Sequence, residues 1–196
     1  MHYVVAATIL LFASLEVRAQ ADTSGIGAIK SGIGVGYNDT NQEKGLGLVS
    51  SIGYQKSFGP KSKLRVNPNL LFGSFSSAGI TDTRDQYYQM TALQIVLAYD
   101  VIRFKSISLF VSAGGSLTYS RGLFGTGDEI EKPGTTSSYF NNVYFGGLGG
   151  VGLRISRQNS RVAYEIKPLN FGFGSNGFLL ANPMISLDYK LKKIIK

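Results

Sequence analysis

The sequence predicts an all-β protein, an eight-stranded antiparallel up-and-down transmembrane β-barrel. Segments in which apolar and polar residues alternate recur eight times along the chain, each bounded by turn residues. One side of these segments is apolar and almost free of charge, whereas the other side holds amide and ionic groups. The connections between the segments are alternately short and long, as they are when strands run up and down around a closed barrel.

Residues 1–19 are expected to form a signal peptide that is removed from the mature protein. Val4 to Leu15 is a largely apolar run of signal-peptide length, too short to cross a bilayer, and small residues follow it. Cleavage is expected after Ala19. No cysteine follows the run, which excludes a lipid-anchored lipoprotein. The mature barrel domain is therefore expected to comprise residues 20–196, a length typical of one domain.

The eight alternating segments are the predicted strands of the barrel. Several are longer than the usual globular strand of about five or six residues. Nearly all supply the roughly 9 to 11 residues that a tilted strand needs to cross a bilayer. Their expected ranges are 28–37, 45–58, 62–75, 87–104, 106–121, 138–156, 161–174 and 178–192.

The lengths of the connections distinguish a short-turn rim of the barrel from a long-loop rim. Short connections follow the second, fourth and sixth segments: SFGPKSK, FKS and RQNSR. Long connections follow the first, third and fifth segments: NDTNQEKG, SSAGITDTRDQ and RGLFGTGDEIEKPGTTSS. The seventh and eighth segments are joined by the brief GSNG. An even number of strands returns both chain ends to the short-turn rim, and closure removes the exposed strand edges.

The segment from Ile107 to Arg121 shows the two sides of a strand, because its odd positions are mostly apolar and its even positions are mostly small and polar. A soluble barrel would turn its apolar side inward and could not enclose so many ionic and amide groups. The apolar side is therefore predicted to face hydrocarbon. Aromatic residues would then form a belt at each membrane interface, with Tyr37, Tyr119 and Phe173 at one rim and Tyr54, Phe58, Tyr99, Phe104, Tyr164 and Tyr189 at the other.

The seventh segment changes phase once. Its outward apolar residues lie on even positions up to Ile166 and on odd positions from Leu169 onward, with Pro168 between them. An extra residue in one strand reverses the phase in this way, and proline cannot donate a hydrogen bond to the ladder. We therefore predict a β-bulge at Lys167 and Pro168.

The chain resembles the small outer-membrane β-barrel proteins, similar in size to the OmpA transmembrane domain and OmpX. The AQ at the end of the signal segment and the glycine-rich strands resemble the PorT-like barrel family of Bacteroidota. The resemblance implies a bacterial outer-membrane location and insertion by the barrel-insertion machinery. Members usually end in an aromatic residue, whereas this chain ends in LDYKLKKIIK, with Tyr189 and Leu191 as its last outward residues.

The composition argues against several kinds of enzyme. The chain has no cysteine, and its one histidine, His2, lies in the expected signal peptide. A mature chain without thiol or imidazole cannot use Ser-His-Asp hydrolysis or histidine-bound zinc. GLGGVG, from Gly147 to Gly152, matches a dinucleotide fingerprint by letters, but it lies within a strand and no helix follows it. We predict no catalytic residue, no cofactor and no metal site.

Charge is distributed unevenly between the two rims. Acids are concentrated in the long loops, including Asp128, Glu129 and Glu131, and bases at the short-turn rim, including Lys61, Lys63, Arg157 and Arg161. The net charge of +8 is therefore not the diffuse signal of a nucleic-acid partner. The basic rim is predicted to meet phosphates of inner-leaflet phospholipid; a merely solvated rim is the alternative. The loop acids could reach lipopolysaccharide through divalent cations, although they lack calcium-loop spacing and a solvated loop tip is favoured.

Inward-facing charges of opposite sign fall on neighbouring strands at similar depth. An eight-stranded barrel has only enough interior for its side chains. We therefore expect these groups to fill the lower lumen as ion pairs instead of lining a channel. The expected pairs are Arg65 with Asp100, Arg154 with Glu165, and Lys30 with Asp188.

The sequence thus favours a monomeric outer-membrane barrel with a packed polar lumen, acting as a structural or surface-interaction protein through its long loops. A small-solute channel is the first alternative. An outer-membrane lipid-modifying enzyme is a second, disfavoured because the enzymes it could resemble use a histidine. A periplasmic lipid-binding barrel is a third, and it would need its apolar face turned inward.

Overall fold

The computed structural model describes residues 27–40, 43–58, 63–77, 86–125, 137–157 and 160–191. Nearly all of these residues lie in strands. The strands are β1 (Gly27–Asp39), β2 (Lys44–Phe58), β3 (Leu64–Ser76), β4 (Gln86–Phe104), β5 (Ile107–Gly125), β6 (Ser137–Ser156), β7 (Val162–Gly174), β8 (Leu179–Ala181) and β9 (Met184–Lys190), with one 3₁₀ turn, η2 (Ser175–Gly177). Within the described ranges, no helix has the length and apolar character needed to cross a bilayer.

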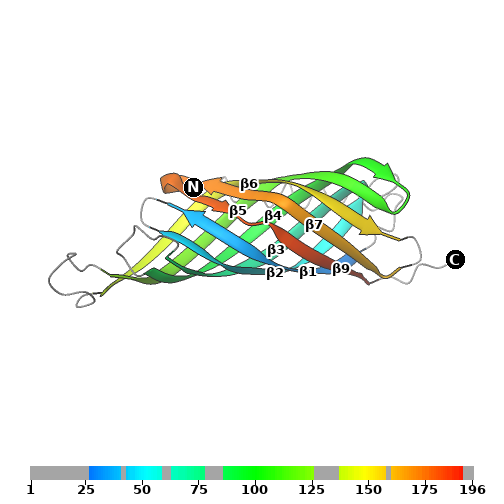
Figure 1. Ribbon diagram of the computed structural model, residues 1–196. Helices are drawn as coiled ribbons and strands as arrows, with labels where there is room; N and C mark the ends of the chain where they lie inside the picture. Colours follow the sequence, from blue (N-terminus) through cyan, green and yellow to red (C-terminus); the bar gives the residue numbers. More distant parts are fainter. Residues whose placement is uncertain are drawn as a thin grey trace.

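The strands form a closed antiparallel ring (Figure 1). Each strand from β1 to β7 pairs with its neighbour in the chain, and β8 and β9 together fill the place between β7 and β1. The two short strands therefore act as one interrupted eighth strand. This ring confirms the predicted eight-stranded up-and-down barrel, and it has no free edge in the part of the chain that the structure describes.

The break in the eighth strand was not predicted. Asn182 and Pro183 separate β8 from β9, yet both pieces keep one register with β1. Proline has no amide hydrogen to donate to the ladder. Asn182 donates its backbone amide to the Asn170 carbonyl at 2.8 Å. A Cβ at Gly34 would lie 2.1 Å from the Pro183 carbonyl oxygen, so glycine is needed where β1 passes the break.

The structure contains the predicted bulge and a second one. Leu153 pairs with Ile166 and Val151 with Leu169, so one residue of β6 faces two of β7, namely Lys167 and Pro168. The predicted bulge is therefore confirmed. The second bulge inserts Val101 into β4, between Asp100 and Ile102. Sequence periodicity does not reveal it, because the extra residue and its successor are both apolar.

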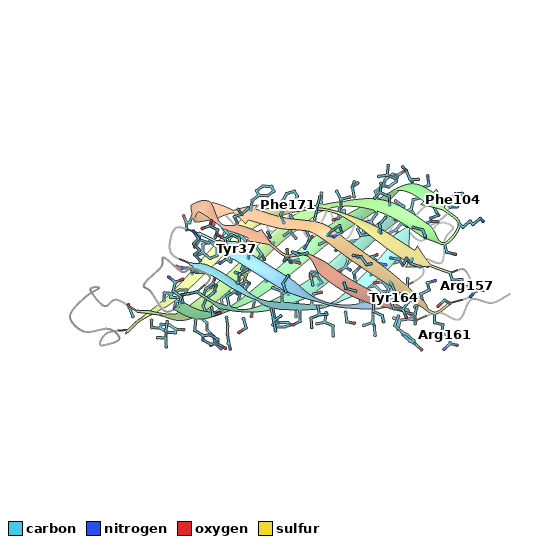
Figure 2. The ribbon with its side chains drawn as sticks, in the orientation of Figure 1. Tyr37, Phe104, Arg157, Arg161, Tyr164 and Phe171 are labelled. Carbon is cyan, nitrogen blue, oxygen red and sulfur yellow. The ribbon has the colours of Figure 1, made fainter. Side chains whose placement is uncertain are left out.

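The side chains point as the alternation predicts. Large apolar residues are widely exposed on the outer face: Ile33 is 64% exposed, Leu48 65% and Phe145 63%. Figure 2 shows outward side chains along the length of the barrel, with Tyr37 and Phe171 toward the long-loop end and Phe104 and Tyr164 toward the short-turn end. Such a continuous apolar surface fits lipid and not water. A periplasmic lipid-binding barrel would need these side chains inside, where the structure does not have them.

Candidate functional site in the barrel lumen

The short-turn end of the lumen holds the six ionic residues predicted from the sequence. The structure brings each expected pair together. The guanidinium Nη2 of Arg65 on β3 lies 2.8 Å from Asp100 Oδ1 on β4. Arg154 Nη1 on β6 lies 2.6 Å from Glu165 Oε1 on β7. Lys30 Nζ on β1 lies 3.4 Å from Asp188 Oδ1 on β9.

These pairs belong to one network. Glu165 accepts hydrogen bonds from Lys30 and Arg65 as well as from Arg154, so three cations from three other strands meet one buried carboxylate. Arg154 Nη1 also reaches Asp188 Oδ2, at 2.7 Å. Neighbouring strands alone could not predict the contacts of Glu165 with Lys30 and Arg65, because both cross the lumen.

Arg103 is a further member of the network, beyond the six predicted residues. Its Nη2 lies 2.5 Å from Asp100 Oδ2, and its side chain remains 35% exposed. The bulge at Val101 separates Arg103 from the regular alternation of β4, so its partner could not be read from the pattern. Two other groups complete this end: Gln55 Nε2 donates to Asp188 at 3.0 Å, and the Arg65 guanidinium carbon lies 4.7 Å from the Phe110 ring centroid.

Aromatic side chains fill the long-loop end of the lumen. Phe75 and Tyr88 stack with centroids 5.2 Å apart, and Tyr88 also contacts Phe140. Tyr144 stacks on Phe178 with centroids 4.9 Å apart. Aliphatic and sulfur-containing side chains surround these five rings: Val49, Leu71, Met90, Leu180 and Met184. We call this set the aromatic plug. The aromatic plug was not predicted, although Phe75, Tyr88 and Met90 occupy inward positions of the alternating pattern.

A buried carboxylate lies against the aromatic plug. Glu43, in the connection between β1 and β2, is 0% exposed. Its oxygens accept hydrogen bonds from Ser120 Oγ at 2.7 Å, Tyr144 OH at 2.7 Å and Asn142 Nδ2 at 2.8 Å. Glu43 belongs to the predicted long connection NDTNQEKG, where no periodic pattern predicts the direction of a side chain. The structure instead turns it inward, where it ties that connection to β5 and β6.

A small cavity of about 20 Å³ lies between the network and the aromatic plug. Lys30 and Lys167 line it together with amide and hydroxyl groups. A water molecule needs roughly 10 to 15 Å³ of such space, so the cavity has room for only one or two particles of that size. The described part of the lumen is therefore filled by side chains at both ends.

The predicted rim residues are only partly described. Lys63 is half-buried, whereas Arg157 and Arg161 are exposed beside the β6–β7 turn at the short-turn end (Figure 2). Lys61 and the loop acids Asp128, Glu129 and Glu131 lie outside the described residues, as does the expected signal peptide. No group of three or more acidic, histidine or cysteine side chains placed to hold a metal occurs in the ranges that are described.

Neither a family model nor a curated protein matches this chain. Solved structures do match it in fold. Neisserial surface protein A (NspA) superposes with a TM-score of 0.57 at 10% identity, covering 84% of this chain and 97% of NspA. Ail, the attachment invasion locus protein of Yersinia pestis, superposes with a TM-score of 0.53 at 11% identity, covering 86% of this chain and 100% of Ail. A major outer membrane protein from Thermus thermophilus superposes with a TM-score of 0.50 at 10% identity, covering 84% of this chain and 99% of that protein.

These likenesses establish the fold, which is that of the small outer-membrane β-barrels, and they confirm the resemblance found in the sequence. The resemblance to the PorT-like family in particular stays a prediction.

Proposed function

We propose that this protein is a monomeric, closed barrel of the bacterial outer membrane that acts as a structural or surface-interaction protein through its long loops, and not as an enzyme. The observation that carries the proposal is the filled lumen. The ionic network fills one end, the aromatic plug fills the other, and about 20 Å³ of cavity separates them. A diffusion pore needs a continuous water-filled path, which the described side chains leave no room for.

The distribution of charge supports an orientation. The short-turn rim carries Lys63, Arg157 and Arg161, and Lys61 lies two residues before Lys63 in the sequence. We place this rim at the periplasmic surface against phospholipid phosphates. The long loops would then face outward, where lipopolysaccharide is the neighbouring lipid. Barrel-insertion machinery is the expected partner during assembly. We propose no nucleic-acid partner.

The loops suggest what kind of surface partner to seek. Ail has been crystallised in complex with the heparin analogue sucrose octasulfate, a polyanion. The long loops of this chain include the acids Asp128, Glu129 and Glu131 and hold more acids than bases. Like charges repel, so a polyanion of that kind suits these loops poorly unless divalent cations bridge the two. We therefore favour a basic partner surface, or lipopolysaccharide bridged by divalent cations.

Two measurements on the full-length protein test the proposal. The outer-membrane fraction is run on a gel with and without boiling in detergent, and a band that shifts on heating is expected for a folded membrane barrel. The purified protein is then added to a planar bilayer, where no discrete conductance is expected. Stable conductance steps would contradict the closed lumen and favour the small-solute channel. A soluble protein without a heat shift would contradict the membrane location.

The conductance measurement needs a variant that should open the lumen. Replacing Tyr88 and Tyr144 by alanine removes rings from both halves of the aromatic plug. If the wild type is silent and this variant conducts, the plug is what closes the long-loop end. If both are silent while the heat shift is retained, the ionic network alone closes the lumen.

A further inference from the structure

Lys167 on β7 is a cation in the lumen without a counter-charge in contact. It lines the cavity between the ionic network and the aromatic plug. Its ammonium group makes no hydrogen bond and no ion pair with any residue in the described ranges. Placing an ammonium group inside a barrel costs free energy unless an opposite charge or several acceptors compensate it. Something other than the described side chains is therefore needed beside Lys167.

The acids nearby are already engaged by other cations. Glu165 accepts from Lys30, Arg65 and Arg154. Asp188 is contacted by Lys30 and Arg154, and Asp100 by Arg65 and Arg103. Basic side chains thus outnumber acidic ones in this described part of the lumen. Of the two lysines that line the cavity, Lys30 contacts two acids and Lys167 contacts none.

Two serine hydroxyls face the same cavity. Ser51 on β2 and Ser186 on β9 pair with Gly32 on β1 from opposite sides, so the three residues form one cross-strand row. A Cβ on Gly32 would lie 2.9 Å from Ser51 Oγ and 2.7 Å from Ser186 Oγ. Neither hydroxyl has a hydrogen-bond partner among the described residues. A side chain at residue 32 would collide with both hydroxyls, so glycine is what lets these two O–H donors lie close together at the wall of the cavity.

The bulge of β7 places Lys167 in this position. Glu165 and Lys167 point inward on odd positions, and the extra residue, Pro168, then shifts the phase so that Leu169 faces outward. Bulges commonly re-aim a side chain at a functional position. Without the extra residue, a lysine at position 167 and an apolar residue at 169 could not occupy opposite faces of one strand.

From these placements we propose that the mid-lumen cavity binds one small monovalent anion, of the size of chloride. The Lys167 ammonium supplies the charge, and the hydroxyls of Ser51 and Ser186 donate hydrogen bonds. The cavity of about 20 Å³ suits an ion only slightly larger than water. Phosphate and sulfate, which carry four oxygens around a central atom, exceed it. The site goes beyond the proposed function, because it does not involve the loops or their partner.

Bromide is the direct probe, because it replaces chloride and scatters X-rays anomalously. Crystals of the full-length protein in detergent are grown in sodium bromide, and an anomalous peak is expected beside Lys167. The peak should be absent from crystals of Lys167→Met. A wild-type cavity that contains only water, with no bromide peak, would overturn the proposal. This outcome would leave the proposed surface role untouched, since neither the lack of conductance nor the presence of a heat-shifted band requires the ion.

The second readout is thermal stability in solution. A ligand that binds only the folded state raises the unfolding temperature in proportion to the logarithm of its concentration above Kd. The midpoint of the heat shift is measured in sodium bromide and in sodium gluconate at equal ionic strength. Bromide should stabilise the wild type more than gluconate does. Lys167→Met should lose this difference, and Gly32→Ala, whose Cβ displaces the two hydroxyls while every charge is kept, should reduce it.

Lys56→Met is the matched control. Lys56 lies over the Phe58 ring at 5.3 Å near the short-turn rim and does not line the cavity, so removing its charge should leave the bromide effect intact. Equal loss in Lys56→Met and Lys167→Met would overturn the proposal, because the anion would then act on the total charge. A bromide effect that survives in Lys167→Met would overturn it as well. If Lys167→Met gives no heat-shifted band, the proposal is still tested by the bromide peak in wild-type crystals and by the bromide stabilisation of Gly32→Ala.

Discussion

Arg154 and Glu165 face each other across β6 and β7 with 2.6 Å between Nη1 and Oε1, and the same arginine nitrogen lies 2.7 Å from Asp188 on β9. One guanidinium therefore contacts acids on two different strands. Glu165 is in turn contacted by cations from β1, β3 and β6. Removing Glu165 should thus affect several strands at once.

Glu165→Ala should lower the free energy of unfolding by about 3 to 5 kcal/mol, because its three cations stay desolvated after their acid is gone. Urea unfolding followed by far-ultraviolet circular dichroism measures the change. Asp39→Ala, at the end of β1, is the control and should cost less than about 1 kcal/mol, because this acid is only half-buried. Equal costs for the two variants would show that the network does not stabilise the barrel.

Ile95→Arg should cost about 2 to 4 kcal/mol if the outer face meets hydrocarbon. Ile95 points outward near the middle of β4, opposite Pro68 and Gly115. Tyr87→Arg lies on the same face of the same strand at the long-loop end, where the cost should fall to about 0 to 1 kcal/mol. Refolding into lipid vesicles followed by denaturant titration compares them. A penalty that does not depend on position would contradict a membrane centred on Ile95.

Glu43→Ala should destabilise the long-loop end by about 1 to 3 kcal/mol, since two buried donors and the half-buried Asn142 lose their acceptor. Lys44→Ala changes the next residue, which is exposed, and should stay within about 0.5 kcal/mol. Urea midpoints of both variants test this. If Glu43→Ala unfolds at the wild-type urea concentration, the carboxylate does not hold the β1–β2 connection in place.

Deleting Pro168 should prevent folding, because loss of the extra residue turns every residue on one side of the deletion to the opposite face. Pro168→Ala keeps the residue count and should cost no more than about 1 kcal/mol, since the proline ring is exposed. The fraction of heat-shifted protein after refolding reports on both variants. A deletion variant that folds with normal yield would mean that the bulge does not set the register.

Neutralising Arg157 and Arg161 to serine should reduce the preference of the barrel for anionic over zwitterionic lipid. Each exposed base contributes up to about 1 kcal/mol on an anionic surface. The difference in unfolding free energy between vesicles of the two lipid types gives the preference. Replacing both by lysine retains the charge and should retain the preference. If the serine and lysine variants show the same preference for anionic lipid, the rim is solvated and does not bind lipid phosphates.

The period of two was enough to predict the barrel from the sequence, because each outward or inward choice repeats over long strands. The bulge at Pro168 was predictable for the same reason. Lys167 is polar and Leu169 is apolar although both are odd positions, so the alternation of polar and apolar residues reverses between them. The bulge at Val101 was hidden, because Val101 and Ile102 read alike in an apolar pattern. The place of Arg103 beside Asp100 was hidden with it.

The lumen was predictable only in part. Partners on adjacent strands follow from register, so Arg65 with Asp100 could be proposed from the sequence. Contacts across the interior, such as Lys30 with Glu165, depend on the stagger of the closed barrel, which the pattern does not encode. The inward turn of Glu43 lay beyond prediction because a connection has no alternation to follow. The approach of the Ser51 and Ser186 hydroxyls to Gly32 could not be predicted either, because it depends on distances between three strands.

The junction between the first and last strands has a consequence for assembly. Lys30 on β1 contacts Asp188 on β9 and Glu165 on β7, so its two acids come from the last part of the chain to be synthesised. A barrel that has not yet joined β1 to β9 leaves Lys30 without its two acids and Arg65 without Glu165. Completion of the ring thus neutralises these cations at the same moment that it joins the strands. An unfinished barrel is electrostatically different from a finished one. The ionic network therefore stabilises the final pairing step, between β1 and β9, more than the earlier ones.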